Sequence, residues 1–207
     1  MSRAKKVIAG IYSAAAEKLY DPLVVKGTFR ALGGDLNQLV LQQGRRALEL
    51  AHGGPILDVP VGTGFFTQEM SSRYEGLVLG TDIAWGMVRE ASKRGVEVVQ
   101  SDVHRLPFPD GTFSVVLCSN GLQVMPGLDD TLVELQRVLA DDGTLLVSVV
   151  NLPLVASDRV PTMFMARRTL MTHLSRAGFD ASYAQLVRLA TLIEARKSAR
   201  VSGPGAP

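Results

Sequence analysis

The stretch from residue 56 to residue 64 reads Ile-Leu-Asp-Val-Pro-Val-Gly-Thr-Gly, and it decides what fold the rest of the chain has to fit. Its apolar start predicts a buried strand over Pro55–Val59, followed by a tight turn and a helix. Gly62 and Gly64 have no Cβ, so the backbone there can approach a ligand closely. The first N–H groups of a helix after such a turn favour a phosphate or a carboxylate. The stretch therefore predicts the first strand of a nucleotide-type pocket.

The next predicted strand, Leu77–Asp82, ends on an acidic residue. A carboxylate at that point can accept hydrogen bonds from both hydroxyls of a ribose. The alternative reading of Asp82 is a cap for the helix that begins at Ala84. A dinucleotide fingerprint is incomplete, because Thr67 stands where a third glycine would be expected.

Outside this segment, strands and helices alternate, which predicts parallel strands joined by crossover helices. Two later runs, Ser182–Leu189 and Thr191–Ala195, have almost no residues between them, which indicates an antiparallel pair at one edge of the sheet. The remaining predicted strands are Val96–Gln100, Phe113–Ser119 and Gly143–Val150, and the predicted helices are Leu36–Ala51, Phe65–Arg73, Ala84–Lys93, Leu128–Leu139 and Arg167–Ala177.

The order of the motifs is more specific than any one of them. Asp58, Gly62, Gly64, Asp82, Ser101-Asp102, Leu106-Pro107-Phe108 and the run Phe113–Asn120 follow one another along the chain. In this order they resemble the motifs of class I S-adenosylmethionine-dependent methyltransferases, in particular the small-molecule branch with methyltransferase domains of the 11 and 25 type. The resemblance covers roughly residues 50–150. Two positions depart from the family pattern: Pro60 replaces a glycine, and Ser114 replaces an aspartate.

The resemblance implies an α/β, Rossmann-like fold with a seven-stranded, mostly parallel sheet, an antiparallel C-terminal strand and helices on both faces. It also implies S-adenosylmethionine as the cofactor. Its amino-acid end would lie over the glycine turn, its ribose against Asp82, and its adenine between Ile83 and Met87, with Asp102 and the Val103 N–H at the base. The residues that the resemblance assigns to the cofactor are Tyr20, Asp58, Pro60, Gly62, Thr63, Gly64, Asp82, Ile83, Met87, Asp102, Val103, Asn120 and Gly121.

A general base is not evident in the sequence. Related O-methyltransferases often carry a histidine shortly after the fourth strand, where this chain has Gln123, Val124 and Met125. Asn120, Gln123 and His104 are therefore only weak catalytic candidates, and the loop position of His104 favours the surface. Methyl transfer from an activated sulfonium needs mainly alignment and exclusion of water.

Composition sets the remaining limits. The 207 residues and 46% hydrophobic content suit one domain, and a net charge of +2 gives no reason to expect nucleic acid. A single cysteine, Cys118, excludes a disulfide scaffold and favours the cytoplasm. We expect one methyltransferase domain over residues 1–200, with a helical lid region over 1–52, a Rossmann-like core over 53–200 and a disordered tail over 201–207. Tyr12, Phe29, Arg30, Trp85 and residues 153–164 are further lid candidates.

The sequence thus predicts methyl transfer to a small, apolar or aromatic metabolite, with oxygen as the favoured acceptor atom. Carbon or nitrogen methylation of a quinone-, lipid- or natural-product-like acceptor stays open, as does a non-catalytic cofactor-binding homologue. A nicotinamide-dependent oxidoreductase is a weaker alternative, because the third glycine is missing. We expect no metal, no integral membrane contact and a monomer or homodimer.

Overall fold

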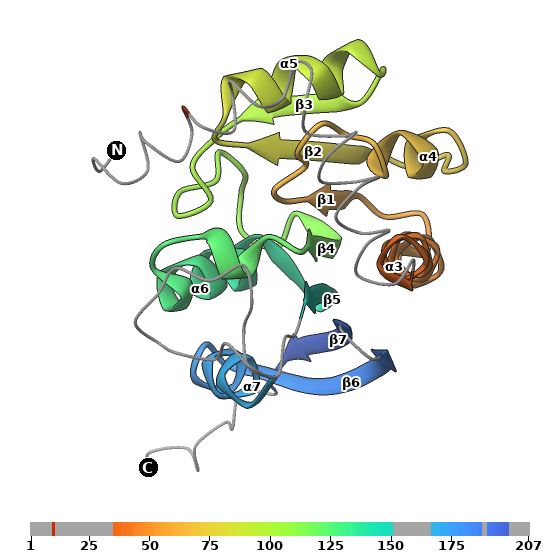
Figure 1. Ribbon diagram of the computed structural model, residues 1–207. Helices are drawn as coiled ribbons and strands as arrows, with labels where there is room; N and C mark the ends of the chain where they lie inside the picture. Colours follow the sequence, from red (N-terminus) through yellow and green to blue (C-terminus); the bar gives the residue numbers. More distant parts are fainter. Residues whose placement is uncertain (1–9, 11–34, 151–166, 188–189, 199–207) are drawn as a thin grey trace.

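The computed structural model describes residue 10 and residues 35–150, 167–187 and 190–198. Within these residues the chain forms one seven-stranded sheet in the order β3-β2-β1-β4-β5-β7-β6 (Figure 1). The strands are β1 (Ile56–Asp58), β2 (Val78–Asp82), β3 (Glu97–Gln100), β4 (Phe113–Ser119), β5 (Leu139–Val150), β6 (Phe179–Val187) and β7 (Ala190–Lys197).

Strands β1 to β5 are parallel, whereas β7 runs antiparallel to both β5 and β6. The predicted antiparallel pair at the sheet edge is therefore confirmed. Only two residues separate β6 from β7, as the sequence indicated. The reversed β7 agrees with the methyltransferase-type topology expected from the resemblance.

Helices cover both faces of the sheet. In Figure 1, α3 (Asp35–Ala51) and α4 (Thr67–Ser71) lie on one side, and α6 (Leu128–Val138) and α7 (Arg167–Arg176) lie on the other. Helix α5 (Trp85–Lys93) packs against β2 and β3, and a short 3-10 helix, η2 (Leu122–Val124), precedes α6.

The central strand β4 explains why the core has two halves. Val115 and Leu117 pack into the cluster beneath α3 and α4, whereas Val116 and Cys118 pack into the cluster beneath α6 and α7. This alternation follows from the period of two in a strand. Because both faces are covered, β4 reads as a continuous apolar run, as expected for a buried parallel strand.

Helix α3 belongs to the helical layer on the sheet. Gln43 is fully buried in its apolar face. The Gln43 amide donates to the carbonyl of Leu146 at 2.9 Å and accepts from the Ser119 hydroxyl at 2.9 Å. Arg46 adds an ion pair with Glu194 of β7 at 2.7 Å. This part of the predicted lid region therefore positions the end of β4. Residues 1–9 and 11–34 lie outside the described chain.

Most predicted element bounds agree with the structure to within one or two residues. The exceptions are β6, which begins at Phe179 instead of Ser182, and β5, which begins at Leu139 instead of Gly143. Leu139 was predicted as the last residue of a helix, but it is fully buried and pairs with Phe113 of β4. Tertiary pairing thus overrides the helical periodicity at that position.

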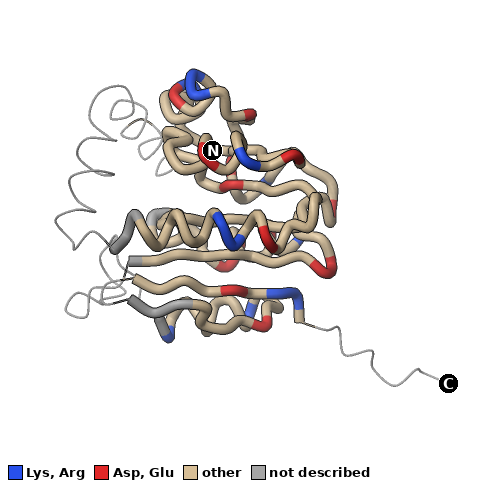
Figure 2. The backbone as a smooth tube through the Cα atoms, turned by 90° about the vertical axis from the view of Figure 1, so that its right-hand side faces the viewer, with Lys and Arg blue, Asp and Glu red and all other residues tan. Residues whose placement is uncertain are grey.

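Acidic and basic side chains are mixed along the described elements, and neither sign of charge dominates. Figure 2 shows acidic and basic residues interspersed along the described elements. Among the residues that the structure describes, no helix is both long and apolar enough to cross a membrane.

Candidate functional site

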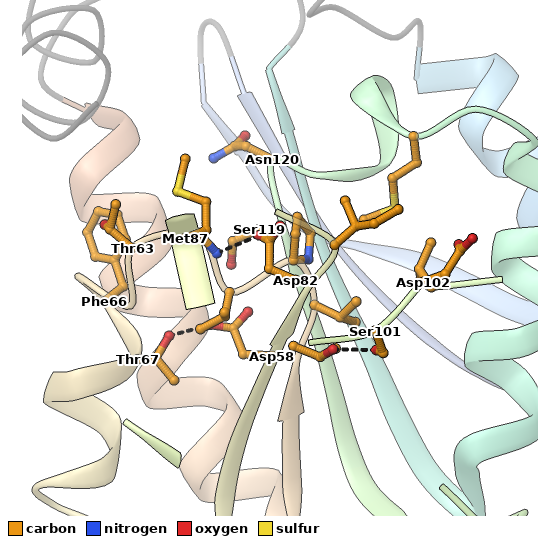
Figure 3. A pocket seen from close by; sticks show the side chains of 18 of the residues that line it. Asp58, Thr63, Phe66, Thr67, Asp82, Met87, Ser101, Asp102, Ser119 and Asn120 are labelled. Atoms are coloured by element: carbon orange, nitrogen blue, oxygen red, sulfur yellow. Dashed lines mark hydrogen bonds between the residues drawn. The ribbon is translucent and has the colours of Figure 1, made fainter. Parts of the chain in front are cut away.

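A cavity of about 170 Å³ opens at the carboxyl ends of β1, β2, β3 and β4. This is the edge at which ligands bind in open parallel sheets. The cavity brings together ten of the thirteen residues predicted for the cofactor: Asp58, Pro60, Gly62, Thr63, Asp82, Ile83, Met87, Asp102, Val103 and Asn120. In Figure 3, Thr63 and Phe66 lie on one side of the site, Asp102 lies on the other, and Asp82 lies between them.

The glycine turn forms the floor of the cavity. The Val59–Pro60 peptide bond is cis, and the Val61 N–H donates to the Thr81 carbonyl at 2.9 Å. Gly62 has a φ of +55°, and a Cβ there would meet no protein atom within 4 Å. Its α-carbon therefore borders open space, and its backbone conformation favours glycine.

Gly64 has a packing role in the structure. It lies outside the cavity lining, and a Cβ added there would come within 2.9 Å of the Ala91 Cβ and 3.1 Å of Val96. The missing side chain thus allows the turn to pack against α5 and β3. A direct contact of Gly64 with the cofactor stays a prediction.

Asp82 holds the turn as well as facing the cavity. Its Oδ2 accepts from the Gly62 N–H at 3.1 Å, and its Oδ1 accepts from the Ala84 N–H at 2.9 Å. Asp82 thus holds the residues that lead into α5, although the N-cap of that helix is Ala84 and no side-chain capping bond is formed. These two bonds do not exclude ribose binding, since a carboxylate can accept about four hydrogen bonds. Burial raises the pKa of Asp82 to about 6.

Asp58 is a second buried carboxyl, at the end of β1. Its side chain accepts from the Thr67 hydroxyl at 2.5 Å, whereas its Oδ1 is buried without a hydrogen-bond partner. Burial, with a smaller contribution from the nearby Asp82, raises the pKa of Asp58 to about 7. An unpaired buried acceptor favours a donor from outside the protein.

The far end of the cavity contains Ile83, Met87, Asp102 and Val103. His104 lines it too, so its predicted surface position is wrong. The His104 side chain is only 16% exposed, because its ring is held between Asp102 and the Pro126 carbonyl.

The residues after β4 divide into two groups. Ser119 and Asn120 line the cavity, and the Asn120 Oδ1 is buried without a partner. Asn120 also has a φ of +51°, a conformation that asparagine tolerates better than most residues. Gly121 and Gln123 lie outside the lining, and a Cβ on Gly121 would approach Pro60 to 2.2 Å. Close packing against Pro60 therefore accounts for a glycine at 121.

Sequence reasoning missed several residues of the wall. Val40 comes from α3, Phe65 and Phe66 follow the glycine turn, and Met125 and Pro126 precede α6. Only the two phenylalanines had a signal in the sequence, because they continue the glycine motif. The predicted Tyr20 and the lid candidates Tyr12, Phe29, Arg30 and residues 153–164 lie outside the described residues, whereas Trp85 is 59% exposed and not part of the lining.

Within the described ranges, no group of three His, Cys, Asp or Glu side chains is arranged to hold a metal ion. Cys118 is fully buried, and burial raises the pKa of its thiol to about 12. A nucleophilic thiolate is therefore not part of this site.

This chain is similar in sequence to known methyltransferases. Residues 56–143 match the family described as "Methyltransferase domain". The chain is 34% identical over 164 residues to the demethylmenaquinone methyltransferase of Thermobifida fusca, covering 70% of this chain and 69% of that protein. It is 33% identical over 158 residues to the ubiquinone/menaquinone biosynthesis C-methyltransferase UbiE of Burkholderia mallei, covering 70% of this chain and 60% of that protein. For two other curated relatives the chain spans 63% and 65% of their length.

A solved structure shows the same fold. The structure described as the "DhpI-SAH complex" superimposes with a TM-score of 0.73 at 21% sequence identity, covering 97% of this chain and 100% of that one. At this level of identity the likeness establishes the fold.

Proposed function

Because the chain belongs to the class I S-adenosylmethionine-dependent methyltransferases, we propose that it binds this cofactor in the described cavity and transfers its methyl group to a small aromatic acceptor. One observation carries the proposal. The glycine turn, Asp58, Asp82 and Asn120 meet in one cavity, although they come from three different strand ends.

The residues fit the chemistry of the cofactor. The buried, unpartnered oxygens on Asp58 and Asn120 can accept from an ammonium group. The open space beside Gly62 admits the amino-acid end close to the backbone. Asp82 would accept from the ribose hydroxyls, and Ile83 and Met87 would pack against the base.

The cofactor supplies an activated methyl group on a sulfonium, and the S–CH₃ electron pair returns to sulfur on transfer. The protein then has to align the acceptor and exclude water. In this arrangement Asn120 lies at the rim of the cavity. The proposal uses no histidine base, and three observations support this. Both ring nitrogens of His104 lie within 2.8 Å of oxygen atoms, His52 is exposed after the end of α3, and His173 contacts Asp129.

We propose an electron-rich quinol-type ring as the acceptor class. The two relatives reported above are named for menaquinone and ubiquinone methylation, which supports this class over an unspecified aromatic. The name of the Burkholderia mallei relative includes the word C-methyltransferase, which supports a ring carbon as the acceptor atom in place of the oxygen expected from the sequence. A ring carbon beside a phenolate is nucleophilic, and the proton lost from that carbon can leave to solvent after methylation.

The test is a transfer assay with labelled S-adenosylmethionine and a demethylated naphthoquinol kept reduced with dithionite. We expect label in the organic phase and a product 14 mass units heavier than the acceptor, with NMR placing the methyl on a ring carbon. A methoxy signal would move the proposal to oxygen. Cofactor binding without transfer to any quinol or phenol would overturn the acceptor class.

A further inference from the structure

One side chain joins the two walls at the far end of the cavity. The Nδ1 of His104 lies 2.8 Å from Oδ1 of Asp102, and its Nε2 lies 2.6 Å from the Pro126 carbonyl oxygen. The backbone N–H of His104 also donates to Oδ1 of Asp102, at 3.1 Å. The residue thus connects the loop after β3 with the turn before α6.

The space around this ring is closely fitted. Gly127 has a φ of +70°, and a Cβ there would lie 3.0 Å from Nε2 of His104. The Thr131 hydroxyl lies 3.4 Å from the same nitrogen. A larger residue at 127 would displace the ring, so the turn before α6 is shaped around His104.

We propose that His104 is a positioning residue that fixes the Asp102 carboxylate and thereby sets selectivity for the cofactor's base. This inference rests on the proposed function, and it assigns to His104 a role that the resemblance does not imply. The residue contacts no reacting atom, so it acts only through Asp102 and the Pro126–Gly127 turn.

The physical reason is restriction of rotation. The backbone N–H of His104 donates to Oδ1 of Asp102, and in the tautomer with its proton on Nδ1 the ring donates to the same oxygen, so the carboxylate is restricted to one orientation. A site built to accept from an amino group then rejects a base that presents a carbonyl oxygen, because two acceptors face each other without a hydrogen between them. If the ring is removed, the carboxylate can rotate and this discrimination weakens.

The experiment compares S-adenosylhomocysteine with S-inosylhomocysteine, in which an oxo group replaces the amino group of the base. Calorimetry on the full chain gives the ratio of the two dissociation constants for wild type, His104→Ala, His104→Gln and Arg105→Ala. Arg105 is an exposed residue of the same loop and serves as the control. Thermal unfolding checks that each variant is folded.

We expect the wild type to favour the adenosyl compound by about tenfold or more, the effect of one hydrogen bond to a charged group. His104→Ala should lose most of that ratio, His104→Gln should restore part of it, and Arg105→Ala should keep it. An unchanged ratio in folded His104→Ala and His104→Gln would overturn the positioning role alone. A wild type that binds neither compound would overturn the proposed function and this inference with it.

Discussion

Asparagine in place of Asp58 should make the protein more stable at alkaline pH while weakening its affinity for the cofactor. The Asp58 side chain is 5% exposed, and one of its oxygens has no hydrogen-bond partner. Asparagine has nearly the same shape and can still accept from the Thr67 hydroxyl. It removes the buried negative charge, which is also the charge that an ammonium group would need.

The magnitude follows from the raised pKa. Burial moves the pKa of Asp58 from 3.8 to about 7. Because the folded-state pKa lies above the unfolded value, the contribution to stability is complete below about pH 4 and is lost as the pH rises through about 7. At about 1.4 kcal/mol per pH unit, the wild type should lose about 4 kcal/mol over this range relative to a neutral side chain. The new amide N–H₂ lacks a partner, which costs about 1–3 kcal/mol at every pH.

Urea unfolding of wild type and Asp58→Asn at about pH 4.5 and pH 8 measures this difference. Asp142→Asn, at an exposed position, controls for the change in net charge. We expect the stability of Asp58→Asn relative to wild type to improve by about 3 kcal/mol between the two pH values, and the control to change little. A difference that is independent of pH would refute the argument, because it would mean that the buried carboxyl has an ordinary pKa.

Three further substitutions test other parts of the site and fold. Asp82→Ala should weaken S-adenosylhomocysteine binding by about 2–4 kcal/mol in calorimetry, since it removes acceptors for the ribose and the anchor of Gly62; unchanged affinity in a folded variant would leave Asp82 with only its backbone contacts to Gly62 and Ala84. Gly62→Val should abolish binding, because valine at a φ of +55° is strained and its side chain fills the open space, whereas normal binding would remove the turn from the site. Arg137→Met should lower the free energy of unfolding by about 2 kcal/mol in urea, because Arg137 bonds the carbonyls of Leu106 and Phe108 as well as Glu134; a loss below about 0.5 kcal/mol would show that the loop holds without it.

The sequence predicted the central strands and the antiparallel edge pair well, because strands such as β4 are buried on both faces and read as continuous apolar runs. β4 has the predicted bounds, Phe113–Ser119. The start of β5 differs from the prediction because Leu139 continues the helical periodicity of α6, and only its pairing with Phe113 of β4 makes it the first residue of a strand. Such non-local pairing leaves no local signal.

The lining of the candidate site was predictable where a residue type is expected for its own chemistry, as with Asp58, Gly62 and Asp82, which all line the cavity. The lining was not predictable where packing against an element distant in sequence determines which residue fits at a position. Gly64 and Gly121 occupy motif positions, yet each lacks a side chain because a neighbouring element lies within 3 Å. The place of His104 depends on the Pro126 carbonyl, 22 residues away in sequence, and no spacing rule connects the two.

The central claim is that this cavity holds S-adenosylmethionine and not a nicotinamide nucleotide. Calorimetric titration of the full chain with S-adenosylhomocysteine, and separately with NAD⁺ and NADH, tests it most directly. We predict saturable one-site heat with S-adenosylhomocysteine and none with either nicotinamide nucleotide. Saturable binding of NAD⁺ or NADH, with no heat from S-adenosylhomocysteine, would contradict the account.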